Sequence, residues 1–265
     1  MRINTSIYTV VLAGLLAVVQ TGCFVNGVKG KKPSSDRSPL QIATDKTSSV
    51  SESILPAQSA KIMKAVEELD PTTVSVVRFG EESQSIWDTP EISVEMPMPP
   101  AVAEFSEEAA EKEINESCRA RKPCRDGKIK DLREAHEEAI WLGEAQQRKE
   151  RGEKLDIIAE AIVRAPSRSA RCTDLYGTRD RIATDGYPRV ILITDGQHTC
   201  ANLSPMKTFP KHTKVLILLT SIKGESAGDG FDKRIAFVEN LFPSDNVQVL
   251  PIVSATSTKI TQALR

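Results

Sequence analysis

The chain contains several short apolar runs, and each of them ends abruptly in polar residues. Residues 190–193 are an unbroken run of Val, Ile and Leu, and Thr194-Asp195-Gly196 follows directly. Such a run is typical of a strand buried on both faces, as in a parallel sheet, and the polar triplet indicates a turn at the carboxyl end of the strand. The same pattern predicts strands over residues 39–45, 74–79, 215–219 and 247–253, and one more strand or an edge hairpin over 85–87 and 92–94.

Apolar residues recur at helical spacing between these strands. Ile62, Val66 and Leu69 share one face of a helix, and Pro71 ends that segment. Helices are therefore predicted over residues 54–69, 171–183, 230–242 and 257–264. Strands that alternate with helices predict an α/β fold built on a doubly wound, mostly parallel sheet.

A long polar segment interrupts this alternation. Prolines at positions 97, 99 and 100 mark its start, and beyond them Glu, Lys, Arg and Ala predominate, which favours helix. We expect helical blocks over residues 102–117, 130–148 and 154–165, the last of which returns to the sheet. Residues 97–153 are thus predicted to be a helical insertion in a domain that spans residues 39–265. Their charged residues form either a solvated face or a partner-binding surface.

The N-terminal stretch has the features of an export signal. Arg2 precedes a run of apolar and small residues over 7–19, and Gln20-Thr21-Gly22-Cys23 follows. This tetrad resembles the lipobox of bacterial lipoproteins, in which the cysteine is lipidated and becomes the mature N-terminus. The resemblance implies a signal peptide over residues 1–22, lipidation of Cys23 and a polar tether over residues 23–38. It also implies a location in the bacterial cell envelope, at the outer membrane where there are two membranes, since no Asp follows the cysteine. Ordinary secretion and an uncleaved anchor are the alternatives.

Charge and cysteine content narrow the possible functions. A net charge of −1 over 265 residues gives no sign of nucleic-acid binding. Without Cys23, four cysteines remain, and an even number in an exported chain favours disulfides. Zinc binding, with His198 beside one of them and His136 elsewhere, is the competing interpretation, although the chain has no Cys-x-x-Cys pair. The four are Cys118, Cys124, Cys172 and Cys200.

Oxygen-bearing side chains follow the predicted strands or precede a helix. Asp45, Thr47 and Ser49 come after the first strand, Thr173 precedes a short helix, and Asp195 follows the apolar run at 190–193. Because ligands bind at the carboxyl edge of such sheets, these residues are candidate ligands. Carboxylates and hydroxyls suit a hard divalent cation, Mg²⁺ or Mn²⁺.

The spacing of these residues resembles the metal-ion-dependent adhesion site (MIDAS) of von Willebrand factor type A (VWA) domains. Asp45-x-Thr47-x-Ser49 is similar to the first loop of that site, Thr173 to its second and Thr194-Asp195-Gly196 to its third. The resemblance covers residues 39–265 and implies a Rossmann-like VWA fold, a bound Mg²⁺ or Mn²⁺, and a protein partner that offers a carboxylate to the ion. Thr178 is the alternative second-loop ligand.

The implied fold also bears on the disulfides, for which three pairings are possible. Cys118 and Cys124 lie close together in one predicted turn between helical blocks. In the implied fold the second and third loops meet around the ion, which would bring Cys172 to Cys200. The expected pairs are therefore Cys118–Cys124 and Cys172–Cys200.

The resulting hypothesis is an envelope-anchored lipoprotein whose domain binds proteins through a metal ion, and not an enzyme. One alternative is the same scaffold without a metal, in which the polar residues only cap helices. The other is a phosphotransfer-type hydrolase with Asp45 as nucleophile, although Thr47 stands where such enzymes carry a second Asp. No Gly-rich phosphate loop, nucleophile elbow or zinc-protease motif is present in the sequence.

Overall fold

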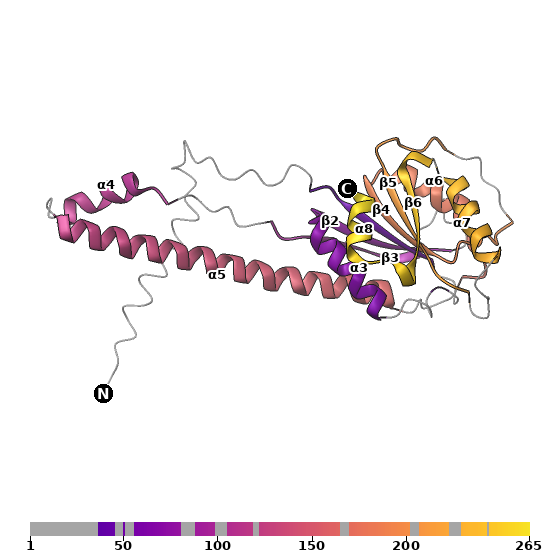
Figure 1. Cartoon of the computed structure of the whole chain (residues 1–265), viewed down its shortest axis with the longest axis horizontal. Coiled ribbons are helices and arrows are strands. Elements are labelled where there is room, and N and C mark those ends of the chain that lie inside the picture. Colours follow the sequence, from indigo (N-terminus) through magenta and orange to yellow (C-terminus); the bar gives the residue numbers. More distant parts are fainter. Residues whose placement is uncertain are drawn as a thin grey trace, which may run out of the picture. The chain divides into compact units, whose positions relative to one another are not determined.

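The structure is a computed structural model of the chain (Figure 1). It describes residues 37–45, 50, 56–80, 88–98, 105–118, 122–164, 170–201, 207–222, 229–242 and 244–265. Cys23, Thr47, Ser49, the predicted signal peptide and most of the predicted tether lie outside the described residues. The chain separates into two compact units, one of residues 1–33 with 100–142 and one of residues 34–99 with 143–265. The bounds of the predicted insertion, residues 97–153, stay a prediction.

The second unit contains a six-stranded sheet with the strand order β3-β2-β1-β4-β5-β6. All neighbouring strands are parallel except the edge pair β2 and β3. The strands span Leu40–Asp45 (β1), Thr73–Phe79 (β2), Asp88–Glu95 (β3), Arg189–Thr194 (β4), Lys214–Leu219 (β5) and Val247–Pro251 (β6). The prediction of a mostly parallel α/β sheet is confirmed, and the order is consistent with a Rossmann-like fold. The direction of winding reverses between β1 and β4, where ligands bind in folds of this kind.

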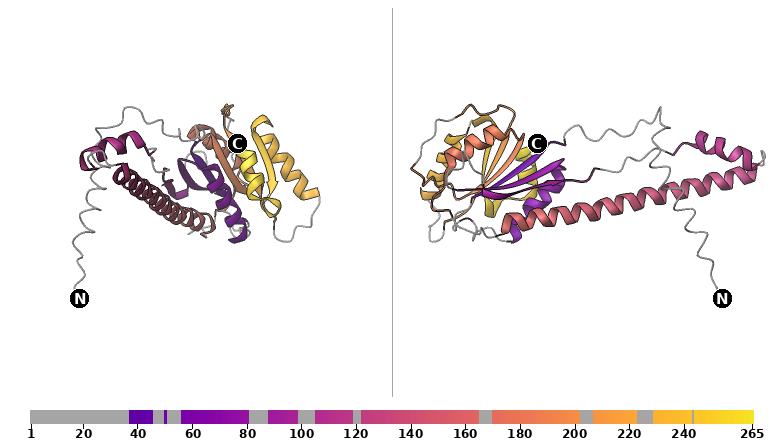
Figure 2. Two further views of the ribbon diagram at one scale, coloured as in Figure 1. Left: turned by 60° about the vertical axis from the view of Figure 1, so that its left-hand side comes forward. Right: turned by 180° about the vertical axis from the view of Figure 1, so that it is seen from behind.

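Helices cover both faces of the sheet (Figure 2). Alternate residues of each strand point to opposite faces; Ile42 belongs to one buried cluster and Ala43 to the other. The first cluster includes residues of α3 (Pro56–Leu69), the last turns of α5 (Lys122–Val163) and α8 (Ser257–Leu264). The second includes residues of α6 (Leu175–Asp185) and α7 (Asp229–Leu241). The sheet is therefore doubly wound.

Several element boundaries differ from those predicted. β6 ends at Pro251, and Ile252–Ser254 is a short 3₁₀ helix, as is Ser244–Asn246. Proline has no N–H for a sheet ladder, so it fits the end of a strand. α6 begins at Leu175, because Asp174 is its N-cap and accepts a hydrogen bond from the Gly177 N–H. Residues 92–94 lie in the antiparallel strand β3, whereas residues 85–87 are outside the described ranges.

The predicted break between the second and third helical blocks is wrong. α5 continues without interruption from Lys122 to Val163, through residues 149–153. Gly152 lies within it, and a glycine costs a helix only about 1 kcal/mol relative to alanine, which the surrounding helix-forming residues offset. α5 also begins earlier than predicted, with Pro123 in its first turn, where proline is tolerated.

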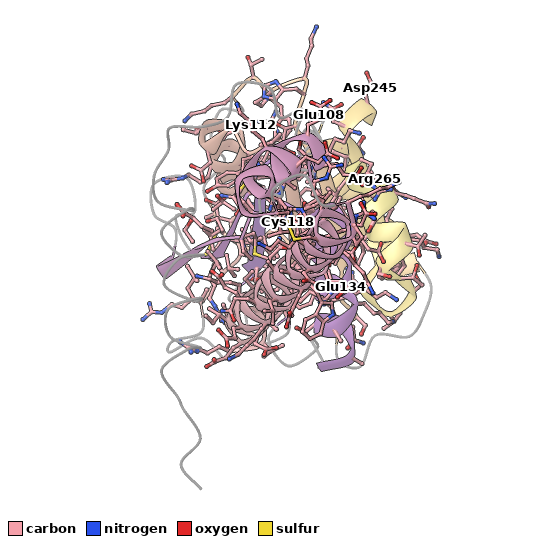
Figure 3. All side chains as sticks on the ribbon, turned by 90° about the vertical axis from the view of Figure 1, so that its left-hand side faces the viewer. Glu108, Lys112, Cys118, Glu134, Asp245 and Arg265 are labelled. Carbon is pink, nitrogen blue, oxygen red and sulfur yellow. A yellow bond between two sulfur atoms is a disulfide. The ribbon has the colours of Figure 1, made fainter. Side chains whose placement is uncertain are left out.

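In the first unit, α4 (Glu107–Cys118) packs against the part of α5 that belongs to this unit. Ile114 of α4 is buried, and the Phe105 ring lies 5.7 Å from the His136 ring. Arg133 contacts Phe105 and forms an ion pair with Glu107. A disulfide joins Cys118 to Cys124, as predicted (Figure 3). Within the described ranges, no helix combines the length and apolar character needed to cross a membrane.

Candidate metal centre at the carboxyl edge of the sheet

Asp45 is the last residue of β1 and lies at the carboxyl edge of the sheet, 1% exposed. The Thr194 hydroxyl, at the end of β4, donates to Asp45 Oδ2 over 2.9 Å. The Thr173 hydroxyl lies 3.3 Å from both carboxylate oxygens. Parallel pairing of β1 with β4 brings the strand ends together, so residues about 130 to 150 positions apart share one buried polar cluster.

The third loop, which follows β4, turns sharply at Gly196. This residue has φ +77°, and a Cβ built on it would lie 2.9 Å from Leu219 Cδ2. Only glycine fits both the left-handed backbone and the close packing. The Thr194 hydroxyl accepts from the Gly196 N–H, and Asp195 Oδ1 accepts from the Gln197 N–H over 2.9 Å. The turn therefore fixes Asp195, which is 4% exposed, at the same edge as Asp45.

The second loop, which precedes α6, is bound to the third loop. The Thr173 N–H donates to Thr199 Oγ1 over 2.8 Å, and the Thr199 N–H donates to the Thr173 carbonyl over 3.0 Å. A disulfide joins Cys172 to Cys200, with the two Cα atoms 5.1 Å apart, as predicted. Two reciprocal hydrogen bonds and a covalent link thus hold Thr173 next to the third loop.

Thr178, the alternative second-loop residue, lies elsewhere. It is fully buried in α6, and its hydroxyl donates over 2.7 Å to the carbonyl of Asp174, the N-cap of the same helix. Of the two threonines, Thr173 therefore contacts Asp45, whereas the hydroxyl of Thr178 binds the backbone at the start of α6.

Two residues that the sequence did not assign to this edge of the sheet support the loops. Arg234 of α7 is 7% exposed, donates to the Asp195 and Thr220 carbonyls, and stacks over Phe231. His198 Nδ1 accepts from the Leu175 N–H at the start of α6 over 3.2 Å, and its ring meets Tyr176 edge to face. Arg234 could have been identified from the sequence, because it is a charged residue between Phe231 and Val238 on the apolar face of α7. No comparable signal marked His198.

The donor chemistry of this edge fits a hard cation. Asp45, Thr173 and Asp195 supply carboxylate and hydroxyl oxygens, the ligands that Mg²⁺ and Mn²⁺ prefer. Thr47 and Ser49, predicted to complete the set, lie outside the described residues. Among the residues that the structure describes, no group of three or more His, Cys, Asp and Glu side chains could hold a metal. The predicted set contains only two carboxylates, so hydroxyls must supply the remaining protein ligands.

Comparison with models of known protein families and with curated proteins finds no match for this chain. The resemblance to VWA domains therefore stays a prediction from three short motifs.

Proposed function

We propose that the carboxyl edge of the sheet binds Mg²⁺ or Mn²⁺ and that the bound ion mediates attachment to a protein partner. The observation that carries this proposal is the cluster around Asp45, in which the hydroxyls of Thr194, at the end of β4, and Thr173, in the loop before α6, lie 2.9 and 3.3 Å from one buried carboxylate. The order of the motifs along the chain, which resembles that of a MIDAS, supports it.

In this proposal, Asp45 and Asp195 offset the two positive charges of the ion. Hydroxyls of Thr173, Thr47 and Ser49 complete the ligand set without adding negative charge. When bound, the ion would supply an electrophilic position for a carboxylate of the partner. The protein's own part is to hold the second and third loops at the edge where Asp45 ends β1, through Gly196, Arg234 and the Cys172–Cys200 disulfide.

We further propose that the chain is a lipoprotein of the bacterial cell envelope, anchored through lipid on Cys23. The lipobox-like tetrad before residue 24 supports this assignment. The two disulfides also support it, because disulfides persist mainly in oxidising compartments outside the cytosol.

One observation favours a metal-free scaffold as a second candidate. The Asp45 carboxylate accepts hydroxyl hydrogen bonds from Thr173 and Thr194, and such a network can hold strand ends together without an ion. A phosphotransfer hydrolase with Asp45 as nucleophile has no comparable support, because this side chain is 1% exposed and Thr47 replaces the second Asp of such enzymes.

Calorimetric titration of the purified full chain with Mg²⁺ separates these candidates. The metal centre predicts saturable binding that Asp45→Asn or Asp195→Asn weakens by about a hundredfold or more, since each change removes a charge that offsets the ion. Asn keeps the shape of Asp and an acceptor oxygen for the threonine hydroxyls, so the fold should persist. Asp185→Asn is a control at a carboxylate that binds Gln41 and Arg181 instead. Absence of binding by the wild type, or equal binding by all three variants, would contradict the metal centre.

A further inference from the structure

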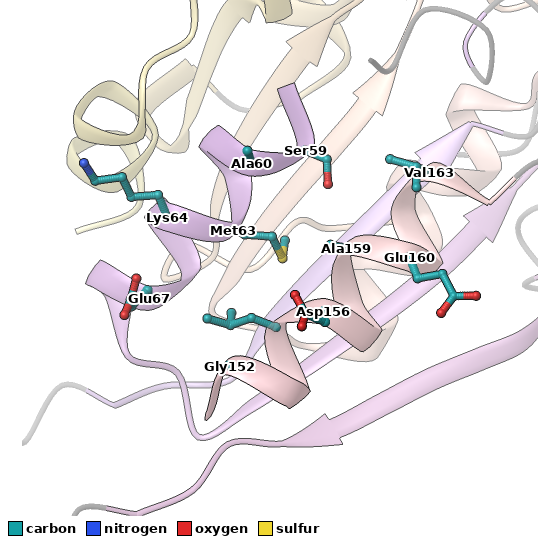
Figure 4. Close-up of a pocket in the computed structure, with 11 residues that line it drawn as sticks. Ser59, Ala60, Met63, Lys64, Glu67, Gly152, Asp156, Ala159, Glu160 and Val163 are labelled. Carbon is teal, nitrogen blue, oxygen red and sulfur yellow. The ribbon is translucent and has the colours of Figure 1, made fainter. Parts of the chain in front are cut away.

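A second surface of the molecule, on the helical layer of the second unit, has the features of a binding groove. A cavity of about 820 Å³ lies between α3 and the last turns of α5 (Figure 4). Ser59 to Glu67 line one wall and Gly152 to Val163 the other. At 1.5 Å per residue, these walls extend for about 13 and 18 Å. The groove therefore offers room for two to three turns of a third helix.

The floor of the groove is apolar. Met63 projects from α3 toward Ala159 of α5 (Figure 4), and Leu155 of α5 also lines the groove. Val163, at the end of the α5 wall, remains 38% exposed. Methionine adapts its shape to different apolar partners, and aliphatic side chains in a groove between two helices suit the apolar face of an amphipathic helix.

The rim of the groove carries an excess of negative charge. The charged residues that line it are Lys64, Glu67, Asp156 and Glu160. Glu160 is paired with Arg164, whereas Glu67 of α3 and Asp156 of α5 form no ion pair within the described part of the chain. One unpaired carboxylate on each wall favours a ligand that carries cationic side chains beside its apolar face.

Gly152 lies at one end of the groove, where a side chain would point into open space. A glycine inside a helix is disfavoured relative to alanine, and a Cβ at this position would meet no atom within 4 Å. Packing within the described structure therefore does not require a glycine here. Its absent side chain leaves space for the close approach of a second backbone.

We propose that the groove between α3 and α5 binds a basic amphipathic helix of a partner protein. The aliphatic residues of that helix would lie on Met63, Leu155 and Val163, and its Lys or Arg side chains would meet Glu67 and Asp156. This interaction is distinct from the proposed metal centre and does not depend on a bound ion.

The test uses three labelled synthetic peptides and the purified full chain, with chelator present so that the metal centre takes no part. One peptide is an amphipathic helix of Leu, Ala and Lys with Leu at i, i+4 and i+7. The second has Glu in place of Lys, and the third has the composition of the first in a scrambled order. Fluorescence anisotropy should show saturable binding of the first peptide, weakening with salt as expected for charge pairs on a rim, and at least tenfold weaker binding of the other two.

Variants locate the binding surface. Glu67→Lys with Asp156→Lys should weaken binding of the basic peptide by about tenfold, since two attractions become repulsions. Glu153→Lys makes one such charge reversal at an exposed position of α5 that does not line the groove, and it should change the affinity by less than about twofold. Gly152→Leu should weaken binding by at least tenfold, because its side chain would occupy the space that a second backbone needs at that end of the groove. Leucine is also the better helix former, so the thermal midpoint of that variant should not fall.

Equal binding of the basic and acidic peptides would overturn the proposal, as would unchanged affinity in Gly152→Leu or in the double charge reversal. Sedimentation of the chain alone is the final control. Self-association that Gly152→Leu abolishes would make a second copy of the chain the occupant and would also overturn the assignment to a basic partner.

Discussion

Two aspartates at opposite edges of the same sheet are held in different ways. Asp70 precedes β2 at the amino edge, where Arg37 Nε lies 2.9 Å from its carboxylate and Arg151 forms a second ion pair with it. Asp45 ends β1 at the carboxyl edge, where hydroxyls of Thr173 and Thr194 contact it. Two guanidinium groups neutralise Asp70 and join the chain before β1 to α5. A hydroxyl donor, unlike a guanidinium group, adds no positive charge beside the Asp45 carboxylate.

The other contacts near each aspartate also distinguish the amino edge of the sheet from the carboxyl edge. Arg37 also donates to the Asp70, Pro71 and Pro97 carbonyls, so the amino edge is a structural junction. The carboxyl edge is instead built from loops joined by the Cys172–Cys200 disulfide and a tight glycine turn. Arginine ion pairs thus make Asp70 part of a structural junction, whereas threonine hydroxyls donate to Asp45 at the edge where ligands bind in such sheets.

The largest expected effect concerns the two disulfides. Cys172–Cys200 closes a loop with a sequence separation of 28, and Cys118–Cys124 one of 6. The chain-entropy relation assigns them about 3.6 and about 2.2 kcal/mol of unfolding free energy. Replacing both cysteines of each pair by serine should lower stability in that order in urea unfolding. The Cys172–Cys200 variant should in addition lose Mg²⁺ affinity, because its two loops carry proposed ligands.

The Cys118–Cys124 variant is the matched control for the metal effect, since that bridge lies in the other compact unit. If both variants bind Mg²⁺ equally well, the disulfide at the carboxyl edge has no part in positioning the ligands.

A second prediction compares two glycines. Gly196→Ala should destabilise the fold by about 2 kcal/mol, because alanine resists a left-handed backbone and its Cβ would overlap Leu219. Gly152→Ala should stabilise α5 by up to about 1 kcal/mol, because a Cβ there meets no atom within 4 Å and alanine favours helix. Thermal unfolding measures both. Equal shifts of the same sign would show that the turn at Gly196 is not as constrained as described.

The sheet was predictable from the sequence because its strands are apolar runs ended by polar turns. Residues 190–193 and 215–219, both predicted as strands, lie within β4 and β5. The continuity of α5 was not predictable from local pattern alone. Gly152 lowers helix propensity there, and the packing of Ile158 and Ile162 against the sheet becomes visible only in the fold.

Part of the candidate site could also be predicted. Asp45, Thr173 and Asp195 were identified from their positions after strands or before a helix, and the structure brings Thr173 to Asp45. The role of Thr194 as a donor to Asp45 was missed, since a hydroxyl at the end of a strand has no distinctive pattern. His198 was considered only as a zinc ligand, whereas its Nδ1 accepts a backbone hydrogen bond at the start of α6.

The smallest expected effect distinguishes Thr173 from Thr178 as the second-loop ligand. Thr173→Val should weaken Mg²⁺ binding by about tenfold, the effect of losing one oxygen ligand of moderate strength. Thr178→Val removes a hydrogen bond within α6 and should cost about 1 kcal/mol of stability without changing Mg²⁺ affinity. Calorimetry and urea unfolding on both variants provide the two readouts. The reverse pattern would assign the second-loop ligand to Thr178.

The measurement that tests the central claim most directly is paramagnetic broadening by Mn²⁺ in the NMR spectrum of the full chain. The proposed metal centre predicts that substoichiometric Mn²⁺ broadens the amide signals of Asp45, Thr173 and Gly196 first, and that excess Mg²⁺ restores them. The amides of Asp70 and Arg151, where arginines neutralise the carboxylate, should remain sharp. Broadening centred on Asp70, or spread over the acidic residues of α4 and α5 while the carboxyl edge stays sharp, would contradict the account.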